Sequence, residues 1–90
     1  MPAQASITAK SVHQITANPA EIADGDVEVV SLTVPGAALG DFPYVVKPTD
    51  DDVYVIAAWV SAADTVKAVF FNPSGSAVNC DAQTVNVILF

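Results

Sequence analysis

The sequence has few of the groups that catalysis or covalent stabilisation would need. It contains one cysteine, Cys80, so no disulfide can form within the chain to support a small core. It contains one histidine, His13, whereas nucleophilic catalysis needs a nucleophile and a base within hydrogen-bond reach. We expect His13 to be a surface or interface imidazole, Cys80 to be a small packing residue, and the protein not to be an enzyme.

Phosphate-binding features are also missing. The four glycines are isolated at turns, so the chain has no glycine-rich loop to cradle a phosphate. Three basic residues stand against ten acidic ones, and the net charge of −7 repels nucleic-acid backbones and anionic lipid surfaces. We therefore expect no nucleic-acid partner. The same charge suits a basic docking surface on another protein.

Long hydrophobic runs are absent, although the composition is apolar. The longest uninterrupted apolar run, residues 53–60, has eight residues, whereas a membrane helix needs about 20. Yet 52% of residues are apolar and 14% are charged, against about 25% charged in an average domain. A single domain of this size buries only about 60–65% of its surface. We expect no membrane partner, and we expect the surplus apolar surface to be buried by self-association, in a trimer.

Turn residues divide the second part of the chain into short segments rich in β-branched residues. The expected strands are Val27–Val34, Tyr44–Lys47, Val53–Val60, Thr65–Phe71 and Thr84–Phe90. Strands at intervals of about 8 to 12 residues predict an all-β fold, a small antiparallel β-sandwich or barrel, jelly-roll-like in type. The continuous apolar run Val53–Val60 predicts a strand that is buried on both faces.

The first 25 residues are rich in Ala, Ser, Thr and Gln and have a looser pattern. We interpret residues 1–25 as an N-terminal arm that precedes a β-sandwich domain at residues 26–90. One strand is expected at Ile7–Ile15. Asn18 and Pro19 predict one helical turn, because proline is favoured at the first helical position. The opening Met1–Gln4 has neither a basic start nor an apolar core, so we expect no secretory signal.

Two acidic groups are candidate binding features. Asp24, Asp26 and Glu28 alternate, so on a strand they would share a face, as calcium ligands sometimes do. Their spacing does not match an EF-hand loop, and a solvated strand entry is the alternative. A second group, Asp50–Asp52, is either a solvated turn or a salt-bridge site for a basic partner. We expect no metal ion and no cofactor.

Three stretches together resemble segments of small virion proteins of tailed phages. They are Ser31–Asp41, which reads SLTVPGAALGD, then Ala57–Val66, which contains AADTV, and Phe71–Gly75, which contains NPSG. The resemblance covers residues 27–90 in order and spacing, and it does not extend to the arm. It implies a virion structural role, of the capsid decoration, cement or head-fibre type.

From this resemblance we expect a capsid decoration (cement) protein. Such a protein is made in the bacterial cytoplasm, binds the outer surface of the assembled head as a homotrimer, and bridges subunits of the major capsid protein. The alternative is a fibre or tail module that binds a receptor or a carbohydrate. The arm is the expected shell contact. The side chains expected at interfaces are Ile7, Val12, Asp50, Asp51, Asp52, Trp59, Phe70, Leu89 and Phe90.

Overall fold

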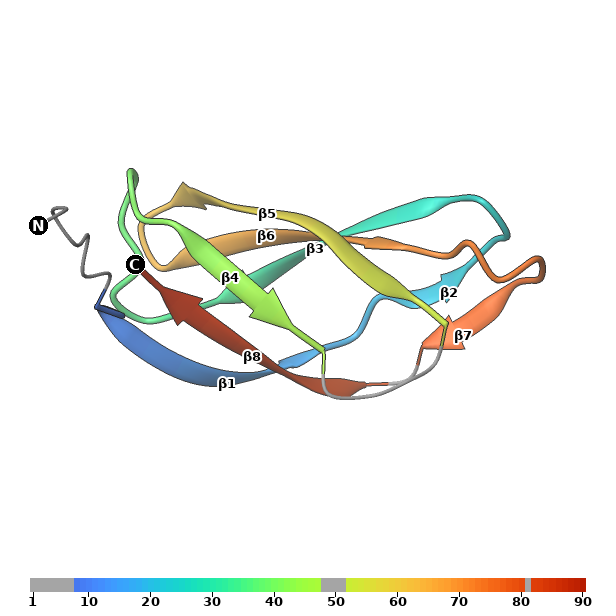
Figure 1. Ribbon diagram of the computed structural model, residues 1–90, viewed down its shortest axis with the longest axis horizontal. Helices are drawn as coiled ribbons and strands as arrows, with labels where there is room; N and C mark the ends of the chain where they lie inside the picture. Colours follow the sequence, from blue (N-terminus) through green and yellow to red (C-terminus); the bar gives the residue numbers. More distant parts are fainter. Residues whose placement is uncertain (1–7, 48–51, 81) are drawn as a thin grey trace, which may run out of the picture.

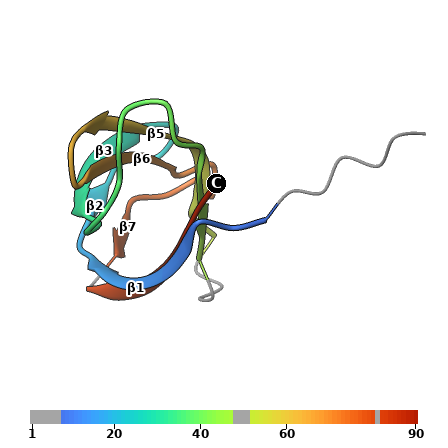
Figure 2. The same ribbon diagram turned by 90° about the vertical axis from the view of Figure 1, so that its left-hand side faces the viewer.

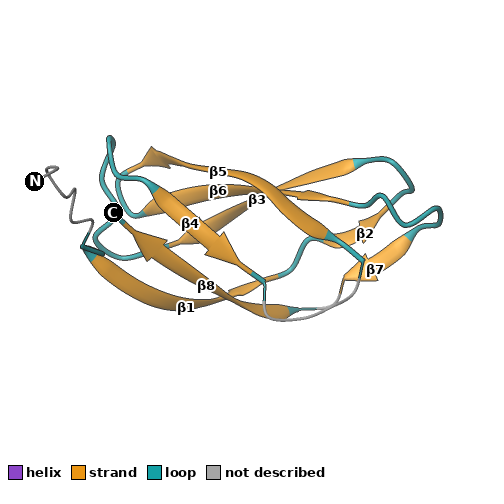
Figure 3. Ribbon diagram, viewed as in Figure 1, coloured by secondary structure: helices purple, strands orange, loops and turns teal. Residues whose placement is uncertain are grey.

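The computed structural model describes residues 8–47, 52–80 and 82–90, and these residues form an antiparallel β-sandwich without helices (Figures 1 and 3). The predicted all-β class is confirmed. The strands are β1 (Ser11–Ala17), β2 (Ala20–Ile22), β3 (Val27–Thr33), β4 (Pro43–Val46), β5 (Tyr54–Ala62), β6 (Thr65–Phe71), β7 (Val78–Cys80) and β8 (Gln83–Leu89).

Two three-stranded sheets make the two layers of the sandwich. One has the strand order β1-β8-β4 and the other β3-β6-β5, while β2 and β7 form a separate two-stranded sheet at one end. All pairings are antiparallel. At the two sides of the sandwich, β4 lies next to β5 and β1 lies next to β3 (Figure 2). The edge strands of the two sheets therefore face each other without joining into one sheet.

The core lies between the two sheets and comes from strict alternation along their central strands. In β6, Val66, Ala68 and Phe70 are buried, and the residues between them are only half-buried. In β8, the buried residues are Val85, Val87 and Leu89. Side chains of a strand point alternately to opposite faces, so these two strands each contribute one apolar row to the core. Cys80 is also buried, as predicted for a small packing residue.

Strand β5 differs from the prediction. The prediction that Val53–Val60 would be buried on both faces was wrong, because Tyr54, Ile56 and Trp59 are exposed. Strand β5 is the edge of its sheet, and no described segment covers the outer face of that sheet. Its register against β6 shifts twice, between Val55 and Ala57 and between Val60 and Ala62. Each shift adds one residue to β5 and turns the strand, as β-bulges do.

The segment before residue 26 is largely part of the sandwich. Strand β1 pairs with β8 over its whole length, and β2 pairs with β7. The predicted helical turn at Asn18 was wrong. Instead, the Asn18 Oδ1 accepts a hydrogen bond from the Ala20 amide at 3.2 Å, and Ala20 has a left-handed φ of 61°. An asparagine side chain that bonds the backbone two residues later stabilises a turn and competes with helix.

The described part of the predicted arm therefore belongs to the fold. Ala17, Pro19 and Ile22 are buried, so the sandwich needs them to complete its core. Residues 1–7 of the predicted arm, including Ile7, lie outside the described residues.

Asn72 joins two turns at the end of the molecule that carries β2 and β7. Its side chain is fully buried, and its Nδ2 donates to the carbonyl oxygens of Ile22 and Ser76, each at 2.8 Å. Its Oδ1 accepts from the Ser74 amide at 3.0 Å. The Asn72 backbone also exchanges hydrogen bonds with Gly25 and Asp26. The NPSG turn is thus held to the turn before β3.

We predict that Asn72→Ala lowers the free energy of unfolding by about 2–4 kcal/mol, because buried carbonyl and amide groups lose their partner. Urea denaturation followed by tryptophan fluorescence measures this loss. The matched control is Asn79→Ala on β7, where the side chain is exposed and the expected change is within about 0.5 kcal/mol. A loss in the Asn72 variant no larger than that of the control would contradict a structural role.

Candidate functional site

The outer face of the β3-β6-β5 sheet is the most distinctive surface of the molecule. The pairing register sets its residues in rows across the three strands. The first row is Val27, Phe71 and Tyr54, the second is Val29, Val69 and Ala57, and the third is Ser31, Lys67 and Trp59. We call these nine side chains the apolar face. Seven of the nine are apolar, and they are continuous across all three strands.

Four side chains of the apolar face, those of Val27, Val29, Tyr54 and Trp59, are open to solvent, whereas Val69 and Phe71 are half-buried. Val27 is 49% exposed, Tyr54 57% and Trp59 43%. Isolated apolar residues are common on protein surfaces, but a continuous apolar patch marks a contact with another molecule. Here adjacent positions on three neighbouring strands are apolar together. The surplus of apolar residues in the composition is therefore located on the outside of a sheet.

The apolar face also differs in charge from the rest of the chain. Its only charged side chain is Lys67, which is paired with Trp59 on the neighbouring strand. The chain has ten acidic residues, and none of them lies on this face. Protein–protein interfaces are depleted in charge at their centre and enriched in aromatic residues, and the apolar face has both properties.

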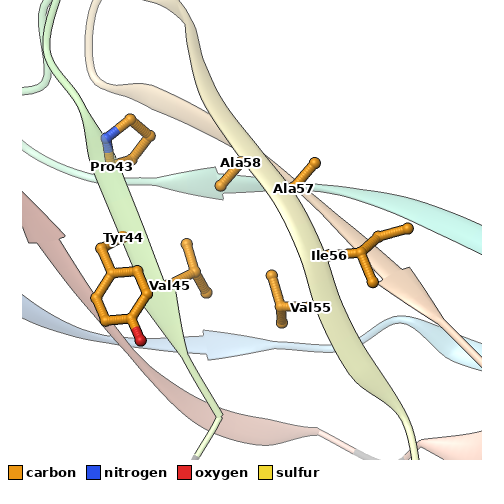
Figure 4. A pocket seen from close by; sticks show the side chains of 7 residues that line it. All are labelled: Pro43, Tyr44, Val45, Val55, Ile56, Ala57 and Ala58. Carbon is orange, nitrogen blue, oxygen red and sulfur yellow. The ribbon is translucent and has the colours of Figure 1, made fainter.

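A groove lies between the edge strands β4 and β5 (Figure 4). Val45 and Val55 point toward each other across it from the two strands, and Ala58 points into the same gap. The groove has a volume of about 140 Å³ and no charged residue in its lining. The lining residues are Pro43, Tyr44, Val45, Val55, Ile56, Ala57 and Ala58.

The other sheet has apolar side chains on its outer surface as well. Val12, Tyr44 and Ile88 occupy one row across β1, β8 and β4, and the first two are exposed. Next to this row, the backbones of Phe42 and Phe90 exchange two hydrogen bonds, of 3.0 and 2.9 Å. Both of these phenylalanine side chains are exposed. This group is smaller than the apolar face and is followed along the strands by the polar Gln14 and Asn86.

The residues predicted at interfaces fall into three groups. Val12, Asp52, Trp59 and Phe90 are exposed, so they are accessible to a partner. Ile7, Asp50 and Asp51 lie outside the described residues. Phe70 and Leu89 are fully buried, so their placement at an interface was wrong. Both occupy inward positions of central strands, where the alternation of β6 and β8 directs them into the core.

Asp24 and Asp26, which precede β3, make hydrogen bonds within and between turns. The Asp24 Oδ1 accepts a hydrogen bond from the Gly75 amide at 3.0 Å, which links this turn to the NPSG turn. Asp26 donates its amide to the Ala23 carbonyl. In the described part of the chain, no three His, Cys, Asp or Glu side chains are grouped so that they could hold a metal ion.

His13 lies on β1 and faces the inside of the sandwich edge. It is half-buried opposite Val87, and its Nε2 is 2.9 Å from the Ser11 Oγ. Within the described residues the ring contacts a hydroxyl and no carboxylate. This contact fixes the orientation of the imidazole at the sheet edge.

Two of the three stretches singled out in the sequence, Ser31–Asp41 and Ala57–Val66, meet at the opposite end of the sandwich from Asn72. Asp64, in the turn between β5 and β6, accepts from the Gly36 amide through Oδ1 at 2.8 Å. Its own amide donates to the Ala37 carbonyl at 2.8 Å, and its carbonyl accepts from Val34. Asp64 has a left-handed φ of 60°, which asparagine and aspartate tolerate better than most residues. The AADTV turn thus holds the VPGA turn.

The VPGA turn has the type II geometry expected for a Pro-Gly pair. The Ala37 amide donates to the Val34 carbonyl at 3.1 Å, and Gly36 has a φ of 88°. The third residue of a type II turn needs a positive φ, which glycine adopts without strain.

The Lys10 side chain connects Gly36 and Asp41 of the following loop to the start of β1. Its Nζ lies 2.7 Å from the Asp41 Oδ2 and donates to the Gly36 carbonyl at 3.0 Å. The Asp41 Oδ2 also accepts from the Ala38 amide at 3.0 Å. The hydrogen bond from Lys10, followed by the one from Ala38, lowers the pKa of Asp41 below its ordinary value of 3.8. These residues are bonded to one another and hold the loop in place.

Sequence reasoning missed most of the apolar face. It selected Trp59 but not Val27, Val29 or Tyr54, and it did not identify the groove. The signal that identifies the apolar face is the register between the strands, because these residues are adjacent only through the pairing of three strands.

We predict that the Asp41 pair contributes stability that is lost in acid. The folded-state pKa is below the unfolded value of 3.8, so the contribution is present above that value and disappears as the pH falls through the lower folded value. The difference in melting temperature between the native chain and Asp41→Asn should be constant near neutral pH and should shrink below about pH 4. In a Lys10→Gln background this pH-dependent difference should be much smaller. An unchanged difference there would contradict the assignment to Lys10.

Within residues 8–47, 52–80 and 82–90, no helix has the length and hydropathy to cross a membrane. No protein-family model matches the chain, and no curated protein or solved structure is significantly similar to it.

Proposed function

We propose that the protein is a structural assembly subunit, and specifically a decoration (cement) protein of a phage capsid. The observation that carries the proposal is the apolar face, since a continuous exposed apolar surface marks a contact with another protein. The resemblance of residues 27–90 to small virion proteins supplies the specific form. Two of the three stretches that carry this resemblance, Ser31–Asp41 and Ala57–Val66, are joined by hydrogen bonds around Asp64.

A decoration protein of this kind works by mass action. If it binds only the assembled head, it stabilises that state by RT ln(1 + [L]/Kd) for each site. Its partners are then the major capsid protein and further copies of itself, in a trimer. The net charge of −7 keeps the free subunit soluble before assembly and suits contact with a basic surface.

A second function is favoured by one observation. Tyr54 and Trp59 are both exposed on the same sheet face, where aromatic rings would be available to stack on a sugar. This arrangement fits a fibre or tail module that binds a carbohydrate or a receptor. The two functions differ in copy number and in ligand.

The copy number in purified virions tests the proposal. We expect a number comparable to that of the major capsid protein, measured by quantitative mass spectrometry of phage particles. A few copies per particle, together with binding on a glycan array that Trp59→Ala abolishes, would support the fibre or tail module instead. Absence from the particles would overturn both.

Binding to heads assembled without the chain tests the role of the apolar face. We predict that Val29→Asp weakens binding at least about tenfold, because the contact would bury an unpaired carboxylate. The matched control is Thr33→Asp, which adds the same charge on the same strand and face, in a row with the polar Thr65. Circular dichroism checks that both variants fold. Equal binding of the two variants would contradict the proposed contact.

A further inference from the structure

The edge of β4 presents backbone groups to the groove between β4 and β5. Phe42 and Phe90 exchange both of their backbone hydrogen bonds, so they form a hydrogen-bonded pair of the antiparallel ladder. Bonding directions alternate along a strand, so Tyr44 and Val46 also face β8. The N–H and C=O of Val45 then point away from β8, on the side of the groove. An extended peptide could pair with this edge.

The groove suits small apolar side chains. Its wall on β5 includes Ala57 and Ala58, and Val45 and Val55 form its floor from the two strands (Figure 4). Since no charged residue lines it, a peptide without charges would enter at the lowest desolvation cost. A strand that alternates small apolar residues with polar residues would place the former in the groove and the latter in water.

Residues 3–9 of the chain have this pattern. Ala3, Ala5, Ile7 and Ala9 are apolar, and Gln4, Ser6 and Thr8 between them are polar, while Met1 and Pro2 precede the alternation. Strict alternation over this length is typical of a half-buried strand. No acidic or basic side chain occurs in residues 1–9, although the whole chain has thirteen charged residues, ten acidic and three basic. The segment therefore matches the groove in side-chain size and in its lack of charge.

A second copy is a better acceptor for this segment than the chain's own groove. The segment joins the sandwich at Lys10, whose amide donates to the Leu89 carbonyl and whose side chain is held by Asp41. It therefore begins at the β1 edge of the sheet, whereas the groove lies beyond β8 at the β4 edge. To add to the free edge of its own β4, the segment would have to cross three strand spacings, about 14 Å, and also reverse its direction. A neighbouring molecule requires neither.

We propose that residues 1–9 of one copy add as a strand to the β4 edge of a second copy and fill the groove between β4 and β5. The donor and acceptor surfaces are different, so the contact is of the head-to-tail type, which forms a ring when the rotation closes. A trimer is such a ring. The proposal concerns contact between copies of this chain and does not depend on the virion role.

Self-association of the full chain tests this contact. Ala5→Asp places a carboxylate on the groove side of the segment and should weaken self-association at least about tenfold, as measured by sedimentation or light scattering over a concentration series. The matched control, Ser6→Asp, adds the same charge on the solvent side and should retain the native mass. Both positions precede β1 in the chain, and a melting curve of each variant that matches the native chain checks that the sandwich is intact. A monomeric native chain at every concentration, or equal loss in both variants, would overturn the proposal.

Disulfide trapping identifies the occupant of the groove. A chain with Ala5→Cys is mixed with a second chain that carries Ala58→Cys, and oxidised glutathione is added. We expect a mixed disulfide dimer that is far less abundant when Ser6→Cys replaces Ala5→Cys, and a synthetic peptide of residues 1–9 should compete with its formation. If a single chain with both Ala5→Cys and Ala58→Cys forms only an internal disulfide, the segment fills its own groove and the exchange between copies is refuted.

Discussion

The structure depends on the alternation of side chains between the two faces of each strand, in a fold whose described strands make two layers. Each strand has an inner row that reaches the core and an outer row that does not. The chain is 52% apolar, and the two inner faces of three-stranded sheets hold only part of these residues. The remainder must lie on the outer faces. The apolar face and the exposed side chains of β5 follow from this constraint.

The ends of the sandwich show the opposite property. Their polar groups are used within the molecule, around Asp64 and Asp41 at one end and around Asn72 at the other. Backbone groups in turns need partners, and side-chain carboxylates and amides provide them here. The turns are therefore held in place by bonds within the molecule, whereas the sheet between them has an exposed apolar face.

The sequence predicted the fold best where the local pattern of residues was strong. β6 and β8 were predicted within about one residue, because alternation and the flanking turns agree. The turns at Pro35-Gly36 and Asn72–Gly75 followed from residue types alone. The two short strands β2 and β7 were missed, since three-residue strands carry little periodicity. Phe70 and Leu89 were assigned to an interface because an apolar residue at a strand end does not reveal its side of the sheet.

The amino-acid sequence by itself determined the all-β class, the positions of the main turns, and the excess of apolar residues over what one small core can bury. These properties are local or additive, so no contact between distant residues is needed to read them. Only the tertiary structure decided where the excess lies. The pairing of β3, β6 and β5 brings Val27, Phe71 and Tyr54 into one row, and the open edges of β4 and β5 create the groove. Both surfaces depend on register and strand order, which are set by contacts between residues far apart in the chain.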